Sequence, residues 1–308
     1  MDNKVVGVAK DFYFTAIAIS GSDDNNTYNL VTLSGTANAD ITKRDLALSN
    51  FVADNKVYDG NTDVISGDGF DDDRVAGDVL AFAYDMAFEN KNVGVAKDVD
   101  FSSIAISGGD DKDNYNLVTL SGTANADITP LDVTVTADSD HSKIYGETDP
   151  VFTYTSVPEL GSKLTDTEVI EFTGELGRVA GENVGIYALT QGTLDNVNYN
   201  ITFASNTFEI TKRRVAVAAD AYQSKTYGDL DPVFTYASNP VLGSKLPNNE
   251  VIHFDGELIR TEGENVGLYA IEQGTLDNSN YEITFVSNDF EITTLDVTVT
   301  VDADQSKT

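Results

Sequence analysis

Hydrophobic and polar residues alternate along short segments of this chain. The segments 133–136 (VTVT), 201–203 (ITF) and 208–211 (FEIT) repeat with a period of two residues, which is the pattern of a strand with one buried face. Gly, Pro, Asn and Asp cluster between such segments, as they do in turns. The pattern predicts an all-β chain, in which only 160–168 has a helical pattern.

Turn residues divide 131–212 into six expected strands, at 133–137, 151–155, 169–176, 185–191, 199–204 and 207–211. Six short alternating strands separated by turns favour a small β-sandwich of the Ig-like type. A β-grasp-like α+β module is the alternative. We therefore expect an all-β tandem array of small Ig-like β-sandwich modules.

The array is indicated by internal repeats. Residues 28–42 and 115–129 are identical, and KIYGETDPVFTY at 143–154 returns as KTYGDLDPVFTY at 225–236. A fixed repeat length of this size is typical of tandem modules. We predict the C-terminal half of a first-type module at 1–43, a whole one at 44–130, second-type modules at 131–212 and 213–294, and the first strand of another second-type module at 295–308.

The junctions between the repeats are short. Each repeat ends in Ile-Thr, and the next alternating segment begins two or three residues later without a Gly/Ser-rich or Pro-rich linker. Flexible linkers have such compositions. We therefore expect stiff joints, and neighbouring modules of the same chain as the first partners of each module.

The charge of the chain narrows the choice of other partners. It has 51 acidic and 19 basic residues and a net charge of −32, which disfavours binding to phosphate backbones and to anionic lipid surfaces. We expect no nucleic-acid partner and no membrane insertion, because no stretch approaches the roughly 20 apolar residues of a spanning helix. The absence of cysteine excludes disulfides, thiolate metal sites and a cysteine nucleophile.

Two motifs occur in both repeat types. One is Lys-x-Tyr followed by Gly or Asp-Gly, at Lys56, Lys143 and Lys225, and the other is a tyrosine at the start of a late strand, at Tyr28, Tyr115, Tyr199 and Tyr281. The second spacing is like that of a tyrosine corner, in which the ring packs in the sandwich and the hydroxyl bonds to upstream backbone. We expect Tyr199 and Tyr281 to be core anchors.

These motifs carry a family resemblance. Residues 44–130, with KVYDGNTD, VAGD and NKNVGVAK, resemble the YDG domain, and 131–212 and 213–294, with YGxxDPxFTY and GENVGxYA, resemble MBG domains of the YGX type. The resemblance implies a large, multidomain bacterial cell-surface protein of the adhesin or haemagglutinin type. It implies no reaction, so we expect no enzyme and no required cofactor.

Acidic residues are the candidates for metal binding. Loop clusters containing Asp71, Asp73, Asp110 and Asp113 could supply oxygen ligands to calcium. Equivalent aspartates near the starts of successive modules, Asp138, Asp220 and Asp302, are placed where a cation could stiffen a joint. The structural alternative is a set of solvated turns. His141 and His253 have no counterparts in the sister repeat, which indicates variable surface positions.

Two other motifs allow a structural and a functional interpretation. The identical GENVG segments at 181–185 and 263–267 are typical of a turn before a strand, with ligand binding as the alternative. Lys143 and Lys225 could form an isopeptide crosslink to Asn206 and Asn288, but we expect their aliphatic stems to lie over the core.

Together these features predict a stalk. We expect an extracellular spacer at the bacterial cell surface that projects a separate binding domain. The alternatives are a module that itself binds a glycan or protein receptor, and a filament subunit, in which 295–308 of one chain adds as a strand to 1–43 of the next in head-to-tail self-association.

Overall fold

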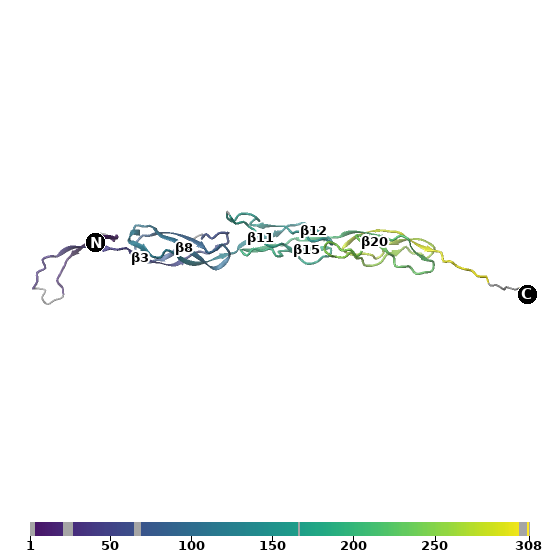
Figure 1. Ribbon diagram of the computed structural model, residues 1–308, viewed down its shortest axis with the longest axis horizontal. Helices are drawn as coiled ribbons and strands as arrows, with labels where there is room; N and C mark the ends of the chain where they lie inside the picture. The colour runs from purple at the N-terminus through teal and green to yellow at the C-terminus, as the bar shows by residue number, and fades with distance from the viewer. Residues whose placement is uncertain (1–3, 21–26, 65–68, 166, 302–306, 308) are drawn as a thin grey trace. The chain divides into compact units, whose positions relative to one another are not determined.

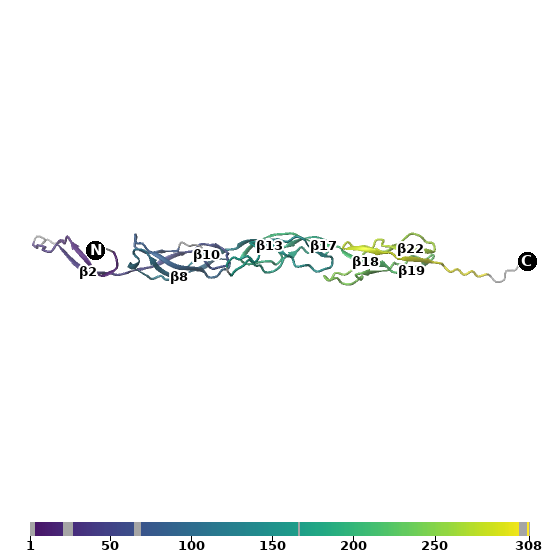
Figure 2. The same ribbon diagram turned by 90° about the horizontal axis from the view of Figure 1, so that it is seen from above.

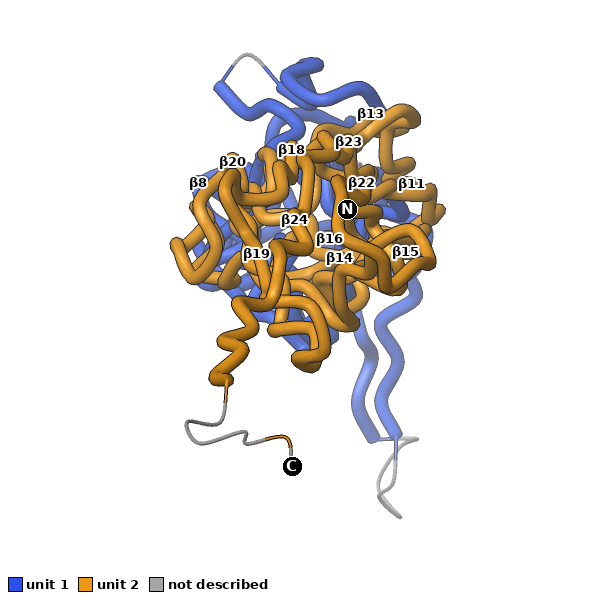
Figure 3. The backbone as a smooth tube through the Cα atoms, turned by 90° about the vertical axis from the view of Figure 1, so that its right-hand side faces the viewer, with its two compact units in different colours: residues 1–133, 158–171, 196–200 blue, residues 134–157, 172–195, 201–308 orange. Residues whose placement is uncertain are grey.

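The computed structural model describes residues 4–20, 27–64, 69–165, 167–301 and 307. The chain divides into two compact units, shown in different colours in Figure 3. Unit 1 consists of 1–133, 158–171 and 196–200, and unit 2 consists of 134–157, 172–195 and 201–308. Both units include parts of 131–212.

The first segment of unit 1 is a two-stranded ribbon. The antiparallel strands β1 (Gly7–Thr15) and β2 (Ser34–Ile41) form it. Phe12 and Phe14 of β1 are 39% and 46% exposed, whereas the residues 87 positions later, Val99 and Phe101, are 0% and 1% exposed. The same strand pair is therefore much less covered in the ribbon than in residues 44–130.

Residues 44–130 form one four-stranded sheet and two smaller pairs. The sheet has the order β5-β10-β8-β7, and the pairs are β3 with β9 and β4 with β6. Figure 2 shows β8 and β10 side by side. The elements are β3 (Arg44–Leu46), β4 (Leu48–Val52), β5 (Lys56–Val57), β6 (Gly69–Asp72), β7 (Ala81–Phe88), β8 (Gly94–Gly108), the 3-10 helix η1 (Lys112–Asn114), β9 (Tyr115–Leu117) and β10 (Gly122–Thr129).

Residues 131–212 form a sandwich of a three-stranded and a four-stranded sheet. The sheet orders are β13-β11-β16 and β12-β17-β15-β14; Figure 1 labels β11, β12 and β15. Alternate residues of β11 and β17 are buried, so each sheet has one face toward a common core. The strands are β11 (Leu131–Ala137), β12 (His141–Ile144), β13 (Tyr154–Val157), β14 (Gly177–Arg178), β15 (Gly185–Thr190), β16 (Tyr199–Ala204) and β17 (Thr207–Thr211).

Residues 213–294 repeat this arrangement within unit 2. The sheet orders are β20-β18-β23 and β19-β24-β22-β21. The first strands run parallel to the last ones: β18 pairs with β23, and β19 pairs with β24. The strands are β18 (Arg213–Ala219), β19 (Gln223–Thr226), β20 (Tyr236–Asn239), β21 (Ile259–Arg260), β22 (Gly267–Glu272), β23 (Tyr281–Val286) and β24 (Asp289–Thr293).

The predicted fold class is confirmed: the modules are all-β Ig-like sandwiches in tandem. The α+β alternative is wrong, since the described residues contain no α-helix, and those of 160–168 form turns and bridges. The strand expected at 169–176 is reduced to single bridges at Val169 and Thr173. The short strands β12 and β14 were not predicted. Residues 294–301 are not in a strand. The equivalent strand β18 is paired in parallel with β23, which comes late in its module, and 294–301 have no such partner among the described residues.

Candidate functional site: the joints between modules

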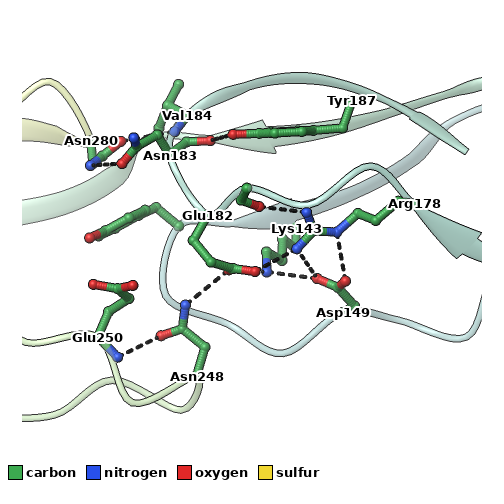
Figure 4. Close-up of polar contacts among 12 residues, drawn as sticks. Lys143, Asp149, Arg178, Glu182, Asn183, Val184, Tyr187, Asn248, Glu250 and Asn280 are labelled. Carbon is green, nitrogen blue, oxygen red and sulfur yellow. Dashed lines mark hydrogen bonds and ion pairs between the residues drawn. The ribbon is translucent and has the colours of Figure 1, made fainter.

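A buried ion network lies in the part of 131–212 that belongs to unit 2 (Figure 4). The Nζ of Lys143 lies 2.7 Å from Asp149 and 2.6 Å from Glu182. Arg178 contacts the same two carboxylates, with its Nε 2.6 Å from Asp149 and its Nη2 2.5 Å from Glu182. The side chains of Lys143 and Arg178 are only 3% and 7% exposed. Two buried cations are thus balanced by two half-buried anions.

The network holds its carboxylates ionised. Burial opposes ionisation of Asp149 and Glu182, but the hydrogen bonds that Arg178 and Lys143 donate outweigh it, so the pKa of each carboxyl lies below its ordinary value. The hydrogen bonds to Asp149 and Glu182 in turn raise the pKa of Arg178. Each group therefore stabilises the charged form of its partners.

Residues 213–294 contain the same network. The Nζ of Lys225 lies 2.7 Å from Asp231 and 2.6 Å from Glu264, and Arg260 lies 2.8 Å and 2.7 Å from the same residues. Hydrogen bonds to Asp231 and Glu264 raise the pKa of Lys225. Both arginines lie over aromatic rings, which favours a cation at this depth: Arg178 over Tyr187 and Phe208, and Arg260 over Tyr269 and Phe290.

The network also fixes the conformation of the GENVG loop. Nη1 of Arg178 donates to the carbonyl of Gly181 at 2.5 Å, and the hydroxyl of Tyr187 donates to the carbonyl of Asn183 at 2.7 Å. Because the loop is held from its own module, its outward-facing backbone N–H groups are fixed in position. This loop is the first half of a joint.

The second half of the joint comes from the following module. The N–H of Val184 donates to Oδ1 of Asn280 at 2.8 Å, and Nδ2 of Asn280 donates to Asn183 at 3.1 Å (Figure 4). We call the bond from the valine N–H to the asparagine the clasp. Nearby, Nδ2 of Asn248 donates to Glu182 at 3.1 Å, which connects the ion network to the joint.

Apolar contacts accompany this clasp. The rings of Tyr145 and Tyr281 meet edge to face at 5.5 Å, and the two residues are each 2% exposed. Burial raises the pKa of Tyr145 to about 12. Gly146 has φ +86°, and a Cβ built there would lie 2.2 Å from Leu246. Only glycine combines that conformation with so close an approach.

Unit 1 contains an equivalent joint between 44–130 and the start of 131–212. The N–H of Val93 donates to Oδ1 of Asn198 at 3.0 Å, which is a second clasp. The rings of Tyr58 and Tyr199 meet edge to face at 6.0 Å. Gly60 has φ +84°, and a Cβ built there would lie 2.7 Å from Glu168. Both second-type modules are thus joined to the segment before them by the same set of contacts.

A third clasp joins the ribbon of 1–43 to residues 44–130. The N–H of Val6 donates to Oδ1 of Asn114 at 2.9 Å. The ribbon adds an ion pair, because Lys4 lies 2.5 Å from Asp78 and 2.8 Å from Asp111. Lys91, 87 residues after Lys4, likewise pairs with Glu168 across the second joint. First-type modules therefore present a lysine at the joint, where the second type presents Glu182.

Several of the calcium candidates make local contacts within their own module. Asp138 accepts a hydrogen bond from Thr153 at 2.6 Å, Asp71 accepts one from Asn50 at 2.7 Å, and Asp73 accepts one from the N–H of Ala47 at 2.9 Å. Asp220, Asp110 and Asp113 were the other described candidates, and Asp302 lies outside the described residues. Among the side chains that the structure describes, no group of three or more His, Asp or Glu is arranged to hold a metal ion. Calcium binding stays a prediction.

The structure refines several sequence interpretations. Lys143 and Lys225 were expected to lie with their stems over the core, and the structure adds that both ammonium groups are buried in ion pairs. Asn206, the proposed crosslink partner, instead donates to the carbonyl of Ala137 at 3.4 Å. His253 is exposed, as expected of a variable surface position, and its backbone carbonyl accepts a hydrogen bond from Nδ2 of Asn278 at 3.1 Å.

The tyrosine prediction holds only in part. Tyr199 and Tyr281 are 8% and 2% exposed, and the N–H of Glu171 donates to the hydroxyl of Tyr199 at 3.5 Å, as in a tyrosine corner. Their rings, however, also pack on Tyr58 and Tyr145 of the preceding module. Sequence reasoning missed this role and that of Arg178. The available signal was that Asn-Val-Gly and Asn-Tyr occur in both repeat types.

Comparisons with known proteins agree with the repeats. The family model described as MBG domain (YGX type) matches residues 133–209 and 215–291, together half of the chain, and the model described as YDG domain matches 42–124. These matches confirm the resemblance drawn from the sequence. No curated protein matches.

Among solved structures, one described as "Crystal structure of Dscam1 isoform 4.44, N-terminal four Ig domains" is similar with a TM-score of 0.20 and 11% identity. The similarity covers 85% of this chain and 77% of that chain. Separately, no helix in the described ranges has both the length and the apolar character needed to cross a bilayer.

Proposed function

Because the chain belongs to the MBG domain (YGX type) family and also carries a YDG domain, we propose that it is an extracellular spacer segment of a bacterial surface adhesin. It holds a separate binding domain away from the cell. We assign it no enzymatic reaction and no required cofactor.

The observation that carries this proposal is the recurrence of the clasp. Val6, Val93 and Val184 each donate to an asparagine of the next segment at 2.8–3.0 Å. A spacer needs each module to be fixed to the next one, whereas a set of independent binding domains does not. Repeating the same polar joint is a simple way to build such a series.

Joint stiffness can be measured in solution because the chain has no cysteine. Ile186 and Leu268 are 72% and 67% exposed at equivalent positions of successive modules. We expect spin labels on Ile186→Cys and Leu268→Cys to give one narrow distance distribution. The same pair with Asn280→Ala should give a broader one. A distribution as broad as that of a flexible linker in the parent chain would contradict the spacer.

A direct binding role is the second candidate, favoured by two equivalent surface hollows beside the buried arginines. Asp149–Phe152 with Glu175–Arg178 line one, and Asp231–Phe234 with Leu258–Thr261 line the other. Val151 and Val233, in these hollows, are 81% and 84% exposed. Binding of the chain alone to a glycan array or to host cells, lost on Val151→Asp with Val233→Asp, would favour this role over a spacer.

A further inference from the structure

The end of 213–294 that corresponds to the covered joint face of 131–212 is open. We call Tyr227, Gly228, Glu264, Asn265 and Val266 the open end face. Tyr227 is 49% exposed, whereas its equivalent Tyr145 is 2% exposed. A Cβ at Gly228 would meet no atom within 4 Å, whereas one at Gly146 would meet Leu246.

The open end face already has the conformation of the occupied one. Arg260 donates to the carbonyl of Gly263 at 2.5 Å, and the hydroxyl of Tyr269 donates to the carbonyl of Asn265 at 2.8 Å. The matching bonds in 131–212 are 2.5 Å and 2.7 Å. Since the ion network holds the loop without a neighbour, little conformational entropy is lost when a partner binds.

The chemistry of the face identifies its partner. The occupied face receives three groups from the following module: the Asn280-Tyr281 pair, the side chain of Leu246 and the amide of Asn248. We infer that the open end face is a docking surface for a further MBG module of the YGX type, one that presents Asn-Tyr, a leucine and a neutral hydrogen-bond donor. This goes beyond the spacer role, because it specifies which module binds.

Neither a first-type module nor a second copy of the chain matches the open end face. The equivalent end of a first-type module presents Asp78 and Asp111, which pair with Lys4, and these carboxylates would repel Glu264. A second copy of the chain offers no free end, because in the described residues Asn114, Asn198 and Asn280 are all clasped by the segment before them. The partner is therefore an additional second-type module.

The test replaces residues 295–308 of the chain with a second copy of 213–294. A single cysteine at Val266 reports the open end face, and one at the equivalent Val184 in the parent chain reports a covered face. Thiol labelling depends on exposure. In the parent chain, we expect the Val184→Cys thiol to react about tenfold more slowly than the Val266→Cys thiol, because the covered thiol reacts only after the joint opens locally. In the extended chain, the Val266→Cys thiol should slow to the Val184→Cys rate.

Two variants make the test specific. Asn248→Asp in the added copy alone should restore fast labelling of Val266→Cys through repulsion from Glu264, and Glu264→Gln in the preceding module should reverse this effect. An additional unfolding transition shows that the added copy is folded. Fast labelling of Val266→Cys beside a folded added copy would overturn the inference, as would equal rates with and without Asn248→Asp. A flexible joint in the spin-label experiment would contradict the spacer but would not overturn this inference, because that experiment measures the joint between 131–212 and 213–294.

Discussion

The two second-type modules, 131–212 and 213–294, have the same strand order and the same ion network, but they differ at one end. The side chain of Glu182 is 39% exposed beside Asn248, whereas that of Glu264 is 68% exposed. The network distances nevertheless agree within a few tenths of an ångström. The comparison shows that the ion network belongs to the module itself, while burial of the tyrosine depends on a neighbour.

The largest expected difference in the free energy of unfolding is between variants of the equivalent tyrosines Tyr145 and Tyr227. Tyr145→Ala removes a buried ring from the joint and should lower the free energy of unfolding by about 3–5 kcal/mol. Tyr227→Ala removes a half-exposed ring and should change it by no more than about 0.5 kcal/mol. Chemical denaturation of the two variants measures both values. Equal losses would show that Tyr145 is not buried by its neighbour.

The arginines should behave alike, in contrast to the tyrosines. Arg178→Met leaves Asp149 and Glu182 without one of their two cations and should destabilise by about 3 kcal/mol, the lower end for a broken buried pair because the carboxylates are partly exposed. Arg260→Met should cost the same amount. A much larger loss for Arg178→Met than for Arg260→Met would mean that the network depends on the neighbouring module after all.

Acid should destabilise the second-type modules through the same ion network. The folded pKa values of Asp149, Glu182, Asp231 and Glu264 are lowered. Their contribution to stability is therefore complete above about pH 5 and is lost as the pH falls through the lowered values. Melting temperatures measured between pH 7 and pH 3 should fall less steeply for a variant that lacks both arginines. An unchanged slope in that variant would place the acid sensitivity elsewhere.

The clasp should have a smaller effect. Asn280→Ala leaves the N–H of half-buried Val184 without its acceptor and should cost about 1–2 kcal/mol. Hydrogen exchange at Val184 should quicken, while exchange at Val266, which has no such acceptor among the described residues, should not change. Similar quickening at both amides would indicate a general loss of stability, and the clasp would then have no local role.

The smallest expected effect belongs to the ion pair of Lys91 with Glu168 in unit 1. The lysine side chain is 40% exposed, and exposed pairs contribute roughly 0.2–1 kcal/mol. Lys91→Ala should therefore destabilise slightly at low salt and not at all in about 1 M salt, where screening is nearly complete. A loss that persists in high salt would assign the effect to packing of the lysine stem.

The alternation of the sequence predicted the strands that have one clearly buried face, such as β11, β15, β16 and β17. It did not predict β12 and β14, because two to four residues around Lys143 and Arg178 show no period. The alternation could not predict the joints either, for a different reason. Val184 and Asn280 are 96 residues apart, and Val93 and Asn198 are 105 apart. Each motif alone is fully explained as a turn or a tyrosine corner, so nothing local indicates that the two meet.

The parallel pairing of the first and last strands has a consequence for how a module resists tension. In 213–294 the chain enters along β18 and leaves along β24, and these strands lie parallel to β23 and β19. If the two ends of the module are pulled apart, the paired strands must slide lengthwise past each other. Their hydrogen bonds then carry the force together, in shear, whereas an antiparallel hairpin pulled from its open end loses its bonds one at a time. Mechanical strength would thus arise from strand direction and would need no covalent crosslink.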